Sequence, residues 1–124
     1  MRLEPSGRLA RGHQFEDLAL GHLARHGLRV LARNFRARGG EVDLVMAEEH
    51  TVVFVEVRSR AKANPVEPVA TVTPLKQSRV IRAAQWFLMQ NPHLAGHPCR
   101  FDVVGITGTL EHHSLTWLRA AFTA

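Results

Sequence analysis

The chain has 124 residues, 45% of them hydrophobic and 22% charged, a composition that excludes a disordered or fibrous protein and suits a single globular domain over residues 1–124. Its formal charge of +5 comes from 14 Arg and 2 Lys and favours an anionic partner such as nucleic acid, because a basic surface gains affinity by releasing counterions. The one cysteine, Cys99, excludes an intrachain disulfide, and the lack of a long apolar run predicts a cytoplasmic protein without a membrane partner.

Residues 6–26 open the chain as a predicted helix. Phe15, Ala19 and Leu23 recur at helical spacing, and Gly27 suits a left-handed C-terminal cap. Three strands should follow, because β-branched and aromatic residues are frequent and alternate with polar ones. Their expected ranges are 28–38, 41–47 and 51–58. The short turn 48–50 makes the last two an antiparallel hairpin.

Residues 59–72 are predicted to form a loop, which is longer than a simple connection needs. Thr73 and Pro74 then supply the N-cap and first-turn proline of a helix over residues 75–90. Two further strands are expected at 99–107 and 113–122. The order α-β-β-β-α-β-β predicts an α/β fold in which helices pack on a mixed sheet.

The second predicted helix has an apolar stripe formed by Val80, Ala84 and Phe87. Trp86 should then lie on the opposite side of this helix. Because an exposed Trp can mark a partner surface, a homodimer is left open.

Charged residues stand inside the two strands of the predicted hairpin. Alternation places Glu56 and Arg58 on one face of the third strand. It places Asp43 on the face of the second strand opposite Val42 and Leu44. A solvated face of a half-exposed sheet is the simplest explanation of these charges.

Glu16 argues against a purely solvated set, because at 100° per residue it falls inside the apolar stripe of the first helix. A carboxylate that faces the sheet must be hydrogen-bonded, paired with a base such as Arg, or bound to a cation. Acids from three elements near a basic residue are also what a Mg²⁺ site for phosphodiester hydrolysis requires. Pairing with Arg and binding of a metal both stay open at this point.

Two other polar features receive a structural interpretation. A pairing with Arg100 or another base explains Asp102 as well as a catalytic role does, so Asp102 is left out of the site. His22 and His26 have the spacing of two zinc ligands, but the sequence offers no evident third ligand, so a zinc site is not predicted.

These motifs resemble the restriction-endonuclease-like superfamily, and most closely its archaeal Holliday-junction-resolvase branch. The shared pattern is F-E on the first helix, then Asp, then E-x-K on consecutive strands. The segments GGEVDLVM, FVEVRSR, VTPLKQ and CRFDVVGITG, in this order, resemble the small bacterial YraN-like family. The resemblance extends from about residue 10 to 122 and implies a restriction-endonuclease-like mixed β-sheet flanked by helices.

The resemblance also implies a site and an activity. Asp43 and Glu56 would ligate Mg²⁺, with Mn²⁺ as an alternative, and Glu16 would complete the acidic cluster. Arg58 stands in the place of the superfamily lysine, and its guanidinium keeps the charge but cannot act as a base. The implied catalytic residues are therefore Glu16, Asp43, Glu56 and Arg58. The implied reaction is metal-dependent, structure-selective cleavage of branched or damaged DNA.

Basic residues flank the acidic segments and suit a groove that follows a nucleic-acid backbone. They are Arg36, Arg38, Arg60, Lys62 and, at the start of the second helix, Lys76. Scattered surface arginines, or a genome that favours Arg codons, explain them as well. Two other functions also stay open: a nucleic-acid-binding or scaffold protein with a silent site, and a protein-interaction adaptor whose acids are paired with Arg.

Overall fold

The computed structural model describes the backbone of residues 7–124 and the side chains of residues 12–124. In chain order the elements are α1 (Gly7–Arg25), β1 (Arg29–Ala37), β2 (Gly40–Glu48), β3 (Thr51–Arg60), the 3₁₀ turn η1 (Pro68–Thr71), α2 (Pro74–Gln90), the 3₁₀ turn η2 (Pro92–Leu94), β4 (Cys99–Gly108) and β5 (His113–Phe122). Residue 6, predicted to begin the first helix, lies outside the described residues. The predicted order of elements and the α/β fold class are confirmed.

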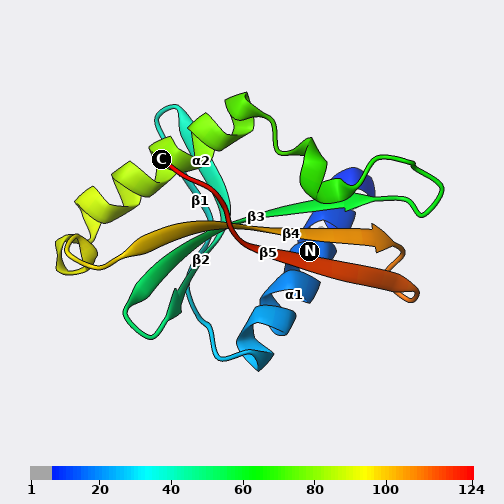
Figure 1. Cartoon of the computed structure of the whole chain (residues 1–124), viewed down its shortest axis with the longest axis horizontal. Coiled ribbons are helices and arrows are strands. Elements are labelled where there is room, and N and C mark those ends of the chain that lie inside the picture. Colours follow the sequence, from blue (N-terminus) through cyan, green and yellow to red (C-terminus); the bar gives the residue numbers. More distant parts are fainter. Residues whose placement is uncertain (1–6) are drawn as a thin grey trace, which may run out of the picture.

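The strands form one mixed sheet in the spatial order β1-β2-β3-β4-β5. Only the β3–β4 pair is parallel, running from Val52 opposite Cys99 to Arg60 opposite Thr107. A parallel pair needs a long crossover, and α2 provides it. Figure 1 shows α1 and α2 on opposite sides of this sheet.

Each helix closes its own hydrophobic cluster, and the sheet separates the two clusters. The cluster on the α1 side joins helix residues Phe15, Ala19 and Leu23 to strand residues Leu44, Met46, Val53, Val55, Val104 and Ile106. The cluster on the α2 side joins helix residues Val80, Ala83, Ala84 and Phe87 to strand residues Val42, Val45, Val52, Phe54 and Phe101. The apolar stripes predicted for both helices are therefore confirmed.

The alternation predicted for β2 is wrong at one position. Leu44 packs in the α1 cluster but Val42 packs in the α2 cluster, so these two residues do not share a face. The ladder between β2 and β3 also ends at the pair Leu44 and Val55. Asp43 therefore sits at an irregular point where the two strands diverge.

The β1–β2 hairpin lies directly on α2. A Cβ at Gly40 would come within 2.5 Å of the Ala83 backbone nitrogen, so only glycine permits this approach. Trp86 is half-buried and its Nε1 donates to the Arg38 carbonyl oxygen at 3.1 Å. The prediction of an exposed Trp86 is wrong, because the returning hairpin covers the side of α2 that periodicity assigned to solvent.

The predicted loop at residues 59–72 is shorter in the structure. Ser59 and Arg60 continue β3, and residues 68–71 form η1.

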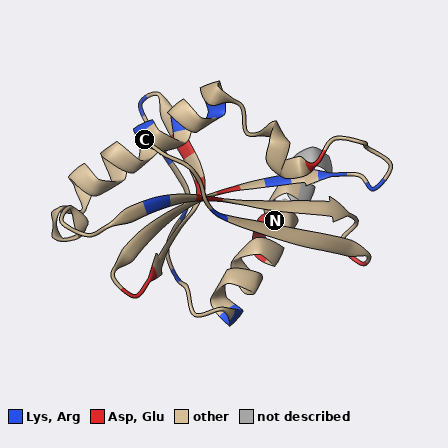
Figure 2. Ribbon diagram, viewed as in Figure 1, with Lys and Arg blue, Asp and Glu red and all other residues tan. Residues whose placement is uncertain are grey.

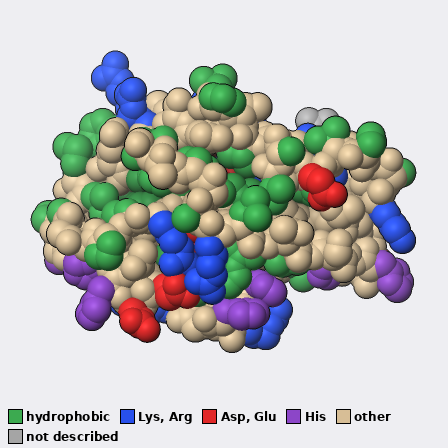
Figure 3. All heavy atoms as spheres, in the orientation of Figure 1, with side chains coloured by type: hydrophobic (Ala, Val, Ile, Leu, Met, Phe, Trp, Pro, Cys, Tyr) green, Lys and Arg blue, Asp and Glu red, His purple; other side chains and the backbone are tan. Residues whose placement is uncertain are grey.

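Figure 2 shows acidic positions on the strand ribbons, and basic positions on α2 and along β3. On the face drawn in Figure 3, Lys or Arg, acidic and His side chains gather below an area of hydrophobic ones.

Among the described residues, none of the helices has the length and apolar character needed to cross a membrane.

Candidate functional site

The diverging ends of β2 and β3 open into a cavity of about 480 Å³, which we call the acidic cavity. Its wall includes Glu16, Asp43, Glu56, Arg58 and Lys76. The other lining residues are Gly12, His13, Phe15, Asn34, Arg36, Glu41, Val57 and Ser59. The structure thus brings together the three acids that the sequence placed on separate elements.

Asp43 is fixed at the point of divergence. Its Oδ2 accepts a hydrogen bond from the backbone N–H of Val57 at 2.8 Å. This N–H lies beyond the end of the β2–β3 ladder, so the Asp43 side chain takes the place of a strand carbonyl. Among the described residues, no Lys, Arg or His forms an ion pair with Asp43.

Glu56 is buried on β3, with only 8% of its surface exposed. Burial raises the pKa of Glu56 to about 9, and the charge of Asp43 and a hydrogen bond with its side chain add to this rise. Arg58 and Lys76 act in the opposite direction, with smaller effects. In the free protein, Glu56 therefore holds a proton at neutral pH, and its carboxyl group is hydrogen-bonded to that of Asp43.

Glu16 approaches Asp43 from α1. It is 9% exposed, and its buried Oε1 has no hydrogen-bond partner among the described residues. Burial and the charge of Asp43 raise the pKa of Glu16, against weaker opposing effects from Asn34, His13 and Arg33. A buried carboxylate oxygen without a partner requires a proton or a cation to offset its lost hydration.

Arg58 follows Glu56 by two residues and is anchored through one nitrogen. Its Nε donates to Thr71 Oγ1 at 2.8 Å, and Thr71 Oγ1 donates in turn to the Pro68 carbonyl at 2.6 Å. Lys76 lies in the first turn of α2, whose N-cap Thr73 accepts from the Lys76 backbone N–H at 3.2 Å. Two cationic side chains thus border the acids.

Arg pairing does not account for the three acids. Among the described residues, ion pairs join Asp17 to Arg33, Glu41 to Arg36, Glu48 to Arg100 and Arg119, and Asp102 to Arg100. Glu16, Asp43 and Glu56 take part in none of these pairs. The alternative that each predicted site acid is neutralised by its own guanidinium is therefore not what residues 12–124 show.

The donor set of the cavity suits a hard cation that keeps most of its water. Within the described part of the chain, no group of three or more His, Cys, Asp or Glu is arranged to enclose a metal. Mg²⁺ needs only one or two carboxylates, and Asp43 and Glu56 supply hard oxygens side by side. The residues therefore fit a hydrated Mg²⁺ and do not form an all-protein cage.

The basic residues predicted to bind nucleic acid divide into two groups. Arg36 and Lys76 line the acidic cavity. Arg38, Arg60 and Lys62 are not part of its wall: Arg38 lies in the turn between β1 and β2, Arg60 ends β3, and Lys62 is exposed in the following loop.

Sequence reasoning missed two polar residues of this region, Asn34 and Thr71. Asn34 lies across from Asp43 in the β1–β2 register and has a positive φ of 50°. Asn tolerates this conformation better than most residues, so an Asn amid strand formers was the available signal. Nothing local in the sequence connects Thr71 with Arg58.

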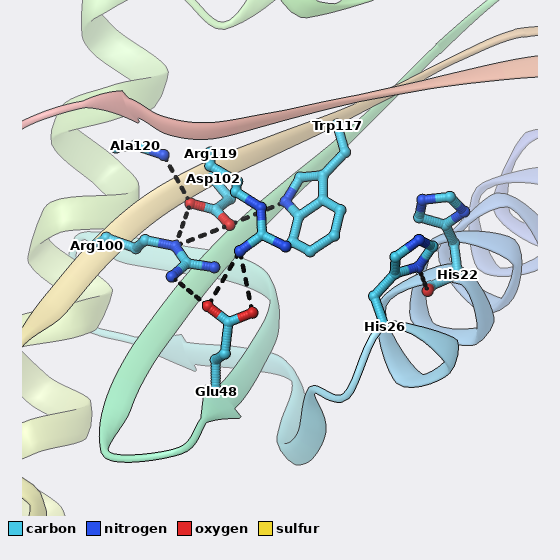
Figure 4. A network of polar contacts seen from close by, with 8 residues as sticks. All are labelled: His22, His26, Glu48, Arg100, Asp102, Trp117, Arg119 and Ala120. Carbon is cyan, nitrogen blue, oxygen red and sulfur yellow. Dashed lines mark hydrogen bonds and ion pairs between the residues drawn. The ribbon is translucent and has the colours of Figure 1, made fainter.

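A third buried acid, Asp102 on β4, has a complete set of partners (Figure 4). It is fully buried and accepts from Arg100 Nε at 3.0 Å, Trp117 Nε1 at 2.9 Å and the Ala120 N–H at 2.9 Å. The predicted pairing of Asp102 with Arg100 is confirmed. We call the group of Glu48, Arg100, Asp102, Trp117 and Arg119 the Asp102 network.

His22 in α1 and His26, which directly follows this helix, pack beside this network. The ring centroids of His22 and His26 are 4.5 Å apart, and both rings meet Trp117 edge-on at 5.9 and 5.7 Å. On the indole, the Arg119 guanidinium lies 3.9 Å from the ring centre. These contacts give the histidines an aromatic packing role.

Known proteins resemble the chain over most of its length. Residues 15–106 match the family model described as "Uncharacterised protein family UPF0102". A UPF0102 protein of Nitrosococcus oceani is 42% identical over 97% of this chain and 97% of its own. Those of Saccharophagus degradans and Cupriavidus taiwanensis are each 50% identical, over 90% and 98% of this chain and 92% and 88% of their own.

Proposed function

The chain belongs to the UPF0102 family, whose name specifies no activity, and we propose from its site that it is a Mg²⁺-dependent endonuclease for branched or damaged DNA. The observation that carries this proposal is the meeting of Glu16, Asp43 and Glu56 in one cavity without an ion pair among the described residues. Carboxylates that are buried together and left unpaired favour a divalent cation as their partner.

In this proposal Asp43 and Glu56 hold the metal through their carboxylate oxygens. Bound Mg²⁺ would supply Lewis-acid activation of a water molecule and of the scissile phosphate. Asp43 is kept in place by its hydrogen bond from the Val57 N–H. Glu56 must release its proton to bind the metal, because its pKa is raised to about 9 in the free protein.

The cationic residues bind the phosphate backbone. The Arg58 guanidinium offers planar donors to phosphate oxygens but does not act as a base. Lys76 adds a charge at the N-terminus of α2, where the helix dipole also favours an anion. Arg36 adds a charge at the wall of the cavity, and Arg38, Arg60 and Lys62 extend the positive surface beyond it. These residues give contacts that do not depend on base sequence.

A second candidate function is nucleic-acid binding without cleavage. It is favoured by Arg58, which stands where the resembling nucleases carry a lysine, because a guanidinium keeps its charge and takes no part in proton transfer. Both functions predict DNA binding, and only the first predicts strand cleavage. The adaptor alternative predicts neither of them.

The test incubates the purified chain with supercoiled plasmid and with a four-way junction, in Mg²⁺, Mn²⁺ or EDTA. We expect metal-dependent nicking that Asp43→Asn and Glu56→Gln reduce by at least about 100-fold, since each removes a metal ligand. The control, Glu111→Gln, changes an exposed acid outside the cavity and should cleave like the wild type. Binding without nicking would support the second candidate function.

A metal-binding readout separates loss of the ion from loss of chemistry. Mg²⁺ at ten times its dissociation constant should raise the free energy of unfolding by about 1.4 kcal/mol in the wild type. Asp43→Asn and Glu56→Gln should show little of this increase. An increase of equal size in all three proteins would place the ion elsewhere.

A further inference from the structure

The anchored nitrogen of Arg58 leaves a defined part of its side chain for a ligand. Thr71 Oγ1 accepts from Nε, and neither terminal nitrogen has a hydrogen-bond partner among the described residues. Arg58 lines the acidic cavity and its charge acts on Glu56. The group that remains for a ligand in the cavity is therefore the outer fork of the guanidinium.

Thr71 is held in place by the turn that carries it. Its hydroxyl donates to the Pro68 carbonyl at 2.6 Å, so its lone pairs are directed to the Arg58 Nε–H. The turn η1 sits on β4 at Gly105, where an added Cβ would lie 2.8 Å from Val69 Cγ1 and 3.2 Å from Pro68 Cβ. The bare backbone of Gly105 thus lets η1 settle close to the sheet.

We propose that Thr71 is a positioning residue that aims the Arg58 guanidinium at a phosphate group of nucleic acid bound in the acidic cavity. The guanidinium is planar, and a hydrogen bond at Nε fixes the direction of its two terminal nitrogens, which phosphate oxygens accept as a pair. Without the hydroxyl, Arg58 loses this orientation and must be ordered when the ligand binds. The inference deepens the proposed function and rests on its nucleic-acid ligand, but not on cleavage.

The test is a double-mutant cycle on binding of a four-way DNA junction in EDTA, where no metal-dependent cleavage occurs. Arg58→Gln should weaken binding about tenfold, the size expected for a charged hydrogen-bonding group. Thr71→Val should weaken it about three- to tenfold, and Thr71→Ser, which keeps the hydroxyl, should stay within about twofold of wild type. The Arg58→Gln/Thr71→Val double variant should bind like Arg58→Gln alone, because Thr71 acts through Arg58.

A purely structural role for Thr71 predicts a different pattern. Losses that multiply in the double variant, or an equal loss in Thr71→Ser, would overturn the inference, as would a wild type that does not bind the junction. Binding that follows the cycle while plasmid nicking is absent would refute only the nuclease.

A second measurement covers the case in which Thr71→Val folds poorly. In the wild type and in Thr71→Ser, the proton on Arg58 Nε should exchange slowly with water. Its ¹H–¹⁵N NMR signal should shift when the junction is added. Fast exchange in the wild type would contradict the anchoring of Arg58.

Discussion

The acidic cavity and the Asp102 network bury acids on neighbouring strands in opposite ways. Asp102 is enclosed by donors from β4 and β5, including the Arg100 guanidinium and the Trp117 indole. Glu56, one strand away, has a second acid, Asp43, as its neighbour and keeps its proton with a pKa raised to about 9. The difference separates an acid whose partners are built into the fold from one that needs a partner from outside.

The same contrast appears in a less buried acid of the network. Hydrogen bonds to Arg100 and Arg119 lower the pKa of Glu48, whereas burial raises that of Glu56. Basic residues are present near both acids, so composition alone does not produce the difference. The difference lies in direct contact. The guanidinium groups of Arg100 and Arg119 bond to Glu48, whereas Arg58 donates its Nε–H to Thr71.

The sharpest way to break this comparison is to remove Asp102. Asp102→Ala leaves the Arg100 Nε, the Trp117 Nε1 and the Ala120 N–H without their acceptor. We expect the free energy of unfolding at pH 7 to fall by about 3–5 kcal/mol, as for other broken buried ion pairs. Urea denaturation measures it, with Glu111→Ala as an exposed control expected within about 0.5 kcal/mol of wild type. A loss below about 1 kcal/mol would show that the network is not structural.

The pH dependence of stability tests the acidic cavity. The Glu56 carboxyl loses its proton near pH 4.5 in the unfolded chain and near pH 9 in the folded one. Between these values the folded state binds more protons, so the free energy of unfolding should fall as the pH rises. We expect a fall of up to about 3 kcal/mol between pH 6 and 8, at about 1.4 kcal/mol per pH unit.

The variant Glu56→Gln identifies the group responsible for this slope. It removes the titrating carboxyl, so its urea-derived stability should exceed that of wild type at pH 8 and vary less with pH. Glu16, whose pKa is raised as well, would contribute a residual slope of the same sign. An unchanged slope in Glu56→Gln would show that the buried acid is not the source.

Loss of a hydrogen bond between uncharged groups should change stability least, and it provides a reference for the effects at Asp102 and Glu56. Trp86→Phe keeps most of the aromatic surface but removes the donor to the Arg38 carbonyl. We expect the free energy of unfolding to fall by about 0.5–1.5 kcal/mol, the usual net contribution of such a bond. Thermal unfolding followed by circular dichroism checks this, and a fall above 3 kcal/mol would mean that the whole hairpin detaches.

The order of elements could be predicted because local signals agree with the final packing. Gly27 has the expected left-handed conformation, with a φ of 92°, and Thr73 caps α2 as predicted. The apolar stripes of both helices match the two clusters, so helical spacing alone identified the core. The position of Glu16 within one such stripe led to the site, because a buried acid is costly wherever it is not paired.

The remaining features depend on contacts between distant segments. No local pattern reveals that the β2–β3 ladder ends at Leu44, so the face of Val42 was misassigned. Trp86 was placed in solvent because helical periodicity does not include a hairpin that arrives from residues 38–40. The anchoring of Arg58 by Thr71 joins side chains 13 positions apart through a turn that composition does not specify.

The contact between Gly40 and the backbone of α2 joins two elements that carry cations of the acidic cavity. Arg36 is on β1, in the hairpin that contains Gly40, and Lys76 is in the first turn of α2. A Cβ at Gly40 would meet the Ala83 backbone, so no side chain separates the hairpin from the helix there. A ligand that contacts both cations would therefore bridge two elements that pack directly on each other.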